Sequence, residues 1–379
     1  MKKILIVIGI VILLAGVSYY ATQMNTPEQS QAPLSTSPAS LSEEQARTAP
    51  RIEVVTQNLT VPWDMVFLPN GSMLITERPG RVRLIDPSGK LQEEPVATLS
   101  NVNQTGESGL HGIALHPDFE NNNYLYLYYT YAGTENNTLN RVSRFTLQNN
   151  TLQNEQIIVD EIPGASNHDG GRIRFGPDDF LYISTGDASD PSLAQNKNSL
   201  AGKILRVTDD GKAAPGNPFN NRAYSLGHRN PQGLTWSESG ELYSTEHGRS
   251  GVQSGLDELN RIEAGGNYGW PTIEGDAQQN GLVTPLLNSG SGTTWAPASA
   301  AYLEGAVYFT GLRGQSLYKA TLQNTNATLE SFISSDYGRL RNVIVGPDGL
   351  LYVSTSNRDG RGIPRGNDDQ ILRINPTKL

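Results

Sequence analysis

The chain of 379 residues contains no cysteine. It therefore has neither disulfides nor thiolate chemistry, and its stability must come from its core, from closure of its fold or from bound ions. Charged residues are scarce, at 18%, and no long segment after residue 50 has the 3.6-residue periodicity of an amphipathic helix. The 39 glycines and 22 prolines indicate many turns instead. The net charge of −9 argues against nucleic acid or an anionic membrane surface as a partner.

The N-terminal segment differs from the rest of the chain. "MKK" precedes an apolar run over residues 4–17, as in a signal peptide, although "YYA" before Thr22 is a poor cleavage site. The run is also shorter than the roughly 20 residues that span a bilayer. Residues 1–21 are therefore either a signal peptide or an uncleaved membrane anchor, and without cysteine lipid attachment is excluded.

Residues 22–50 are rich in Ser, Thr, Pro and Gln, which predicts a flexible tether before a folded domain at residues 51–379. Because the two lysines of the N-terminal segment stay inside, the rest of the chain is exported. We expect a periplasmic or extracellular protein, which is held at the inner membrane if the apolar segment is retained.

A turn-and-strand unit recurs along the folded domain. Most copies have an apolar residue, a turn of Pro, Asp, Gly or Asn, and then a strand such as "LYISTGD". The copies lie at residues 67–80, 115–130, 175–187, 236–248, 301–314 and 345–357, the fifth being the most degenerate. A second strand follows each copy, at residues 81–86, 141–147, 203–207, 259–263, 316–321 and 370–375.

Six copies at about 55 residues each match the blades of a β-propeller. The spare strand at residues 52–59 is expected to complete the last blade and close the ring. A pair of β-sandwiches or a solenoid is the alternative, but the regular units and the spare strand favour an all-β, six-bladed β-propeller. Function must then be argued from the loops at one end of the ring.

Two of these loops combine a titratable or cationic group with a rigid backbone. In "ASNHDGGRIRFGP", His168 precedes two glycines and is suited to accept a hydroxyl proton, unless it only caps a turn. In "LGHRNPQGL", Arg229 and Asn230 precede Pro231, which restrains the backbone. The planar guanidinium of Arg229 suits carboxylates and oxyanions, and an ion pair between blades is the structural alternative.

Two further loops suggest an ion and a polyanion. Residues 244–271 offer carboxylates and exposed carbonyls, which makes a Ca²⁺ site plausible, although EF-hand spacing is absent. In "YGRLRNV", Arg339 and Arg341 alternate and so face the same side of a strand. With Arg313 they would form a cluster of three cations, which suits a polyanionic ligand. Any one of these arginines alone could simply be an exposed basic residue. "TGESGLHGIALHPDF" adds Glu107 and His111.

Several of these motifs, in order, resemble the soluble PQQ-dependent glucose/sorbosone dehydrogenase family, particularly its periplasmic aldose sugar dehydrogenases. They are "GESGLHGIALHPDF", "NHDGGRIRFGPD", "LGHRNPQGL", "GGNYGWP" and "GRLRNVIVGPDGLLYVST", and the resemblance covers about residues 55 to 375. It implies a six-bladed propeller that binds pyrroloquinoline quinone (PQQ), a tricarboxylate ortho-quinone, with Ca²⁺ over the channel. It also implies oxidation of an aldose to a lactone, with electrons passing to an acceptor that the sequence does not identify.

The resemblance implies a role for each matching residue. His168 falls at the position of the catalytic base, and Arg229 at that of a group beside the quinone oxygen, where it would stabilise charge as hydride arrives. The residues implied to contact the cofactor are Glu107, Arg229, Asn230, Arg313, Arg339 and Arg341, and Asn167 beside His168 is a further candidate.

The implied Ca²⁺ ligands are the backbone carbonyls of Gly248 and Arg249. Here the chain departs from the family, which commonly has Pro at the position of Arg249 and a shorter segment between Gly248 and Asp257. Trp295 in "TTWAPAS" is a candidate to line the sugar pocket. A calcium-dependent propeller lactonase is an alternative function, as is a non-catalytic binding propeller. The lactonase would need carboxylate and Asn ligands in the channel and would have no need of three arginines.

Overall fold

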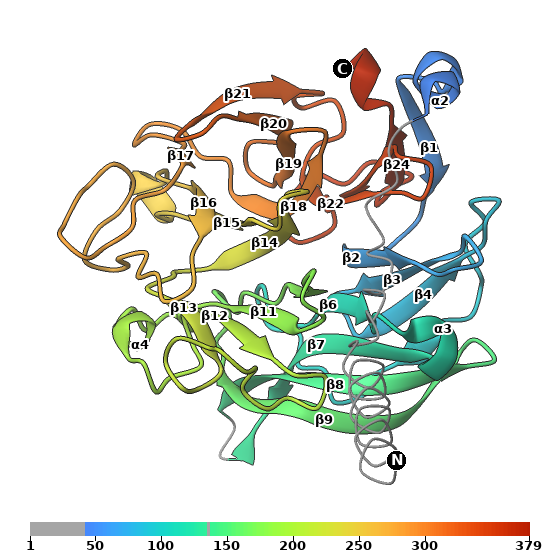
Figure 1. Ribbon diagram of the computed structural model, residues 1–379. Helices are drawn as coiled ribbons and strands as arrows, with labels where there is room; N and C mark the ends of the chain where they lie inside the picture. Colours follow the sequence, from blue (N-terminus) through green and yellow to red (C-terminus); the bar gives the residue numbers. More distant parts are fainter. Residues whose placement is uncertain (1–41, 135–136) are drawn as a thin grey trace, which may run out of the picture. The chain divides into compact units, whose positions relative to one another are not determined.

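The computed structural model describes residues 42–134 and 137–379. All described residues belong to one compact unit. Within the described residues the strands form six four-stranded antiparallel sheets, arranged in a ring (Figure 1). The predicted all-β, six-bladed β-propeller is confirmed.

Five of the six sheets follow the chain from a first, inner strand to a last, outer one. The first sheet consists of β2 (Pro62–Phe67), β3 (Met73–Glu77), β4 (Arg81–Ile85) and β5 (Ala97–Thr98). The second consists of β6 (Leu110–Leu115), β7 (Tyr124–Ala132), β8 (Thr138–Gln148) and β9 (Thr151–Pro163). The third consists of β10 (Ile173–Phe175), β11 (Leu181–Thr185), β12 (Lys203–Val207) and β13 (Ala223–Leu226). The next two sheets are β14 (Pro231–Trp236), β15 (Leu242–Glu246), β16 (Glu258–Ile262), β17 (Leu287–Asn288); and β18 (Pro297–Leu303), β19 (Ala306–Gly311), β20 (Leu317–Leu322), β21 (Ala327–Phe332).

The sixth sheet joins the two ends of the domain. It consists of β22 (Leu340–Val345), β23 (Leu351–Thr355), β24 (Ile371–Ile374) and, as its outer strand, β1 (Ile52–Thr56). β1 pairs with β24 through Ile52 opposite Ile374 and Val54 opposite Leu372, and the two strands lie side by side in Figure 1. The predicted closure by the spare strand is therefore correct, and it leaves no unpaired strand between the first and last blades.

The core lies between the blades. The buried apolar side chains form six clusters among the described residues, one at each junction of two adjacent sheets. The second strands β3, β11, β15 and β23 are buried along their whole length, because each lies between two neighbouring blades. This explains why "LYIST" and "LYVST" are almost continuously apolar or small, whereas β4 alternates.

The first strands pack against one another around the ring, and polar groups fill the space between them. Asp64 of β2 accepts hydrogen bonds from Arg174 Nη1 and Nη2, both at 2.7 Å, and from Asn342 Nδ2 at 3.1 Å. Arg172 Nη1 lies 2.5 Å from Asp64 Oδ1. Burial raises the pKa of Asp64, but Arg172 and Arg174 outweigh burial and the net pKa is lowered. The centre of the ring is therefore a fixed ion cluster.

Helices are short in the described residues: α2 (Glu43–Thr48), α3 (Phe119–Asn122), α4 (Ser192–Gln195), η2 (Gly251–Gln253) and η3 (Pro376–Lys378). α2 lies in the last part of the predicted tether, where Ser42 and Gln45 form a capping box. Asn375 Nδ2 donates to Ala46 O at 2.9 Å, so this part is attached to the C-terminus. The rest of the tether and the apolar run at residues 4–17 lie outside the described residues. No described helix is long and apolar enough to cross a membrane.

Candidate active site

A cavity of about 330 Å³ opens at the end of the ring where the first strands begin. Its walls come from the segments before β6, β10, β18 and β22 and from those after β15, β19 and β23. Eight residues singled out from the sequence as site residues line it: Glu107, Asn167, His168, Gly248, Arg249, Arg313, Arg339 and Arg341. Segments that are distant in sequence are thus brought together at one hollow.

His168 is held by a carboxylate beneath it. Its Nδ1 lies 2.8 Å from Asp187 Oδ1, and Asp187 Oδ2 accepts a hydrogen bond from Trp270 Nε1 at 2.8 Å. A carboxylate at Nδ1 favours the tautomer with the proton on that nitrogen, which leaves Nε2 free to accept another. The backbone of His168 has φ 63°, a conformation uncommon outside glycine that clusters at functional sites. The imidazole is therefore held in a fixed orientation, with Nε2 as its remaining acceptor atom.

Arg341 of β22 and Arg339, which directly precedes this strand, share one buried carboxylate. Arg339 Nε and Nη2 each lie 2.8 Å from Asp359 Oδ2, and Arg341 Nη2 lies 3.9 Å from the same oxygen. Burial raises the pKa of Asp359, but Arg339 and Arg341 outweigh burial and the net pKa is lowered. One carboxylate therefore partly neutralises two cations.

The cavity has an excess of positive charge. Five arginines line it against three carboxylates, and Arg341 is buried with no closer carboxylate than Asp359. Burial lowers the pKa of Arg341 to about 9, and the neighbouring Arg78 and Arg339 also lower it, whereas Asp359 acts in the opposite direction. An anionic ligand would supply the missing negative charge, because buried cations require partners.

Glu107 connects the two sides of the cavity mouth. Its Oε1 is paired with Arg361 Nη1, and its Oε2 accepts the His168 backbone N–H at 3.5 Å. Burial raises the pKa of Glu107, while His247 and Arg361 lower it, with a net value of about 2. Glu107 is thus a carboxylate at neutral pH. His247 also lines the cavity, and its Nε2 is buried without a hydrogen-bond partner.

Arg229 and Asn230 do not line the cavity but lie directly behind its wall. Arg229 Nη2 donates to Ser250 Oγ at 2.8 Å and Nη1 to His247 O at 3.2 Å, so its guanidinium contacts two lining residues. Asn230 Oδ1 accepts the Gly170 N–H at 3.0 Å, which fixes the loop that follows His168. In this arrangement the Arg-Asn pair supports the wall.

Trp295 does not lie where the sequence suggested. Its side chain is only 4% exposed and packs against Phe309 and Tyr318 in the core between two blades. The neighbouring residues Thr294 and Ala296 line the cavity instead. The expectation that Trp295 contacts a sugar is therefore not supported, because a large ring next to a cavity gains more from burial against other aromatic rings.

The extra residues between Gly248 and Asp257 form a small hairpin. Arg249 pairs with Gly255 across an antiparallel bridge, and η2 forms the tip. A Cβ added at Gly248 would collide with the carbonyl oxygens of Gly255 and Leu256, so glycine allows several carbonyl oxygens to gather here. The side chain of Arg249 bonds to Glu274. In the described residues, no group of three or more acidic or histidine side chains is placed to hold a metal ion.

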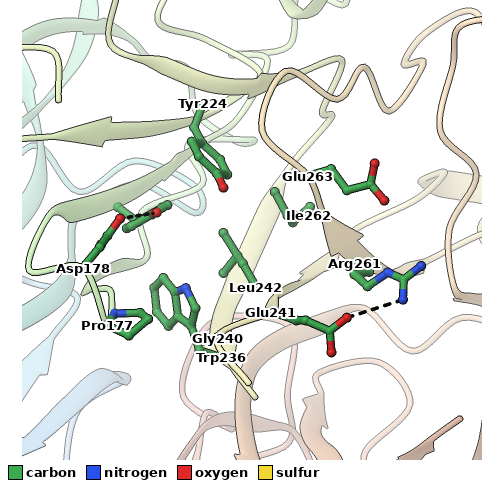
Figure 2. Close-up of a pocket in the computed structure, with 11 residues that line it drawn as sticks. Pro177, Asp178, Tyr224, Trp236, Gly240, Glu241, Leu242, Arg261, Ile262 and Glu263 are labelled. Carbon is green, nitrogen blue, oxygen red and sulfur yellow. Dashed lines mark hydrogen bonds and ion pairs between the residues drawn. The ribbon is translucent and has the colours of Figure 1, made fainter. Parts of the chain in front are cut away.

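A second hollow, of about 360 Å³, lies at the opposite ends of the strands (Figure 2). Figure 2 shows the hydrogen bond that Asp178 accepts from the Tyr182 hydroxyl and the ion pair between Arg261 and Glu241. Tyr182 and Arg206 both bond to Asp178, and Tyr352 and Arg373 bond to Asp348 in the same way in the last blade. The hollow is thus built from the propeller repeat and contains none of the candidate site residues.

Sequence reasoning missed Asp187, Asp359 and Arg361. Asp187 and Asn357 occupy the same place, two residues after the buried second strands "LYIST" and "LYVST". Alignment of the repeats could have shown that this position faces the end of the ring where the cavity lies. Asp359 and Arg361 come from an irregular loop after β23, and no periodic pattern points to them.

Solved structures similar to this chain include sugar dehydrogenases. A solved structure from Thermus thermophilus, described as a candidate oxidoreductase (glucose dehydrogenase), is 46% identical, covers 85% of this chain and 99% of its own, and has a TM-score of 0.80. The PQQ-bound aldose sugar dehydrogenase of Streptomyces coelicolor is 38% identical, covers 85% and 97%, and has a TM-score of 0.79.

The aldose sugar dehydrogenase YliI of Escherichia coli is 29% identical over 86% of this chain and 92% of its own. The family model described as "Glucose / Sorbosone dehydrogenase" matches residues 59–365, which include every candidate site residue. The chain therefore belongs to the glucose/sorbosone dehydrogenase family.

Proposed function

We propose that this protein oxidises aldose sugars to lactones with PQQ and Ca²⁺ bound in the cavity. The observation that carries the proposal is the placement of His168, oriented by Asp187, in the same hollow as five arginines. The likeness to a PQQ-bound aldose sugar dehydrogenase supports the choice of cofactor. A neutral sugar alone would not need so many cations.

The residues present fit a ligand with three carboxylates. Arg339, Arg341 and Arg313 would bind carboxylates, since guanidinium groups pair with them in a planar, two-point fashion. Arg341 has a pKa lowered by burial, which an adjacent anion would reverse. The unpartnered Nε2 of His247 offers one more polar contact. Asn167 and Glu107 lie on the same wall and would bound the ligand's edge.

The calcium ion would be held by the carbonyl oxygens of Gly248 and Arg249. Hard cations bind oxygen, backbone carbonyls included, and carbonyl groups crowd around Gly248. Arg249 O accepts only one long hydrogen bond, from Gly255 N at 3.4 Å, so it retains capacity for an ion. Arg229 and Asn230 would keep this wall and the His168 loop in place, with the charge of Arg229 next to the bound group.

When bound, the quinone supplies the hydride acceptor and the ion polarises it. The task of the chain is to position the sugar and to move a proton. His168 Nε2 would take the proton of the hydroxyl on the carbon that loses hydride, and Asp187 would stabilise the resulting imidazolium. Glu107 and Arg361 close one side of the mouth, which limits water near the reacting carbon.

The test is reconstitution of the purified apoprotein with PQQ and Ca²⁺, followed by a panel of aldoses. We expect aldose-dependent reduction of the cofactor, seen by absorbance, and release of a lactone. In His168→Ala, PQQ binding should persist while turnover falls at least about 100-fold, the usual contribution of a positioned base. His116→Ala, which changes a histidine at the opposite end of the strands, is the control. Absence of both PQQ binding and aldose oxidation in the wild type would refute the proposal.

A further inference from the structure

Two loops border the mouth of the cavity. The first is the hairpin from Gly248 to Asp257, and the second follows β23 from Asn357 to Asp368. Gly248, Arg249, Ser250, Gly251 and Ser254 of the first loop and Arg361 of the second line the cavity. The exposed residues Val252, Arg358, Ile363 and Arg365 of these loops are called the rim below.

The rim carries the two most exposed large apolar side chains of the described residues. Val252 is 105% exposed and Ile363 is 90% exposed, whereas the other two exposed ones, Val54 and Ile157, are at 45% and 46%. A single exposed apolar residue is ordinary. Here, however, both project from loops that border one cavity mouth, and one of them lies on the hairpin formed by the extra residues.

Positive charge surrounds these apolar tips. Arg358 donates to Asp368 O at 2.6 Å, and Arg365 donates to Asp336 O. In the described part of the chain neither of these two arginines forms an ion pair. The acids of the same loops, Asp257, Asp359 and Asp368, are buried and hydrogen-bonded. On these two loops the exposed charged side chains are therefore all arginines, although the chain as a whole has a net charge of −9.

The redox balance of the proposed reaction requires an external electron acceptor. Oxidation of one aldose to its lactone breaks a C–H and an O–H bond, forms a C=O bond and releases two protons and two electrons. A one-electron carrier must therefore dock twice for each sugar. The ion cluster of Asp64, Arg172, Arg174 and Asn342 fills the space between the first strands, so a docking protein comes nearest to the cavity at its open mouth, past the rim.

We infer that the rim is the docking surface for a small acidic electron-carrier protein. This inference rests on the proposed function. Apolar tips among unpaired cations match the anatomy of weak, transient electron-transfer interfaces, which have a small apolar centre and a charged border. Complementary charge raises the rate of encounter and makes it sensitive to salt. The occupant is therefore negatively charged and presents an apolar patch to Val252 and Ile363.

The test compares an acidic and a basic c-type cytochrome as acceptors of the reconstituted enzyme across ionic strength, with uncharged 1,4-benzoquinone as a small acceptor. We expect kcat/KM for the acidic cytochrome to exceed that for the basic one at least about tenfold at low salt and to fall steeply as salt rises. In Val252→Ser/Ile363→Ser the KM for the acidic cytochrome should rise about tenfold, because two aliphatic side chains that docking would partly bury are lost. Turnover with benzoquinone should not change.

The controls use equivalent residues away from the mouth. Val54→Ser/Ile157→Ser removes the other two exposed apolar side chains, and Lys90→Glu reverses a charge in the turn after β4, to be compared with Arg365→Glu on the rim. If the rim variants behave like these controls, or if both cytochromes react at equal rates, the inference is wrong. Turnover with benzoquinone in the same experiments would show that the proposed function still holds. Binding of the acidic cytochrome to the apoprotein, measured by NMR titration, gives a second readout. No salt-dependent binding there would also overturn the inference.

Discussion

Asp187 contacts His168 and Trp270 through different oxygens of one carboxylate, each at 2.8 Å. Asp187 Oδ1 also accepts the Ser189 N–H at 2.8 Å, and the Asp187 N–H donates to Arg229 O at 2.8 Å. The carboxylate is therefore fixed on every side before it orients the imidazole. This arrangement connects the base to the loop that carries Arg229.

The first prediction concerns this carboxylate. In Asp187→Asn the amide can donate to Nδ1 and so favour the tautomer with the proton on Nε2, which cannot act as a base. We expect kcat for aldose oxidation to fall about 100-fold or more, within the range for loss of a positioned acid–base group. PQQ affinity, measured by fluorescence titration, should change little.

Trp270→Phe is the matched control for this prediction. It removes the hydrogen bond to Asp187 Oδ2 but leaves the one to His168 in place. Its kcat should stay within a few-fold of the wild type. If both variants lose activity equally, Asp187 acts through packing of the loop and not through the imidazole.

The second prediction concerns the carboxylate shared by Arg339 and Arg341. In Asp359→Asn two buried guanidinium groups lose their anion, which should cost the apoprotein about 3–5 kcal/mol in free energy of unfolding. PQQ would return negative charge to the same place, so the deficit should shrink when the cofactor is added. Chemical denaturation with and without PQQ measures the difference.

Asp348→Asn provides the comparison for this experiment. Asp348 pairs with Arg373 at 2.7 Å, at the opposite ends of the strands from the cavity. The loss of stability in this variant should be the same with and without PQQ. A deficit in Asp359→Asn that PQQ leaves unchanged would show that the two arginines do not bind the cofactor.

The propeller could be predicted from the sequence because its signal is repeated. Turn residues and buried second strands recur six times, and β1 has no partner except β24 among the described strands. His168, Arg339 and Arg341 were found because they stand beside strands of this repeat, where the topology brings all loops to one end of the ring.

The residues that the sequence did not reveal depend on tertiary packing. Arg361 reaches Glu107 from a loop 254 positions away in sequence, and no local pattern encodes that contact. Trp295 was a candidate to line a sugar pocket, but the neighbouring rings of Phe309 and Tyr318 hold it in the core. Arg229 lies behind the wall because His247 and Ser250 stand between it and the cavity.

The third prediction is a pH dependence of stability. His111 is stacked between Trp63 and Tyr128, with ring centroids at 4.7 and 5.9 Å, and burial lowers its pKa to about 3. The unfolded chain binds a proton at this histidine below about pH 6.5, whereas the folded chain does not, so stability is lost as the pH falls from 6.5 towards 3. The slope for one proton is about 1.4 kcal/mol per pH unit.

His111→Gln should remove this contribution. The amide can still donate to Glu107 O, which His111 Nε2 contacts at 3.0 Å, but it does not titrate. Urea denaturation at several pH values between about 7 and 4, which lie across the window of the shifted pKa, should therefore show a smaller acid-induced loss of stability in the variant. Parallel curves for the two proteins would mean that His111 takes up its proton equally well in the folded state.

The last prediction concerns a buried amine in the third blade. Lys203 Nζ donates to Leu193 O and Ala194 O at 2.9 Å each and to Ala201 O at 2.7 Å, and so satisfies three carbonyl groups around α4. Lys203→Met keeps the length of the side chain but removes these three hydrogen bonds. Leu193 O and Ala194 O still accept the N–H groups of Asn196 and Gly227, whereas Ala201 O loses its donor, so the change should cost about 1–3 kcal/mol, as expected for one buried unsatisfied group. Lys212→Met, at an exposed lysine paired with Asp210, should change stability by less than about 0.5 kcal/mol. Thermal denaturation of the two variants distinguishes them, and equal midpoints would show that water replaces the amine without cost.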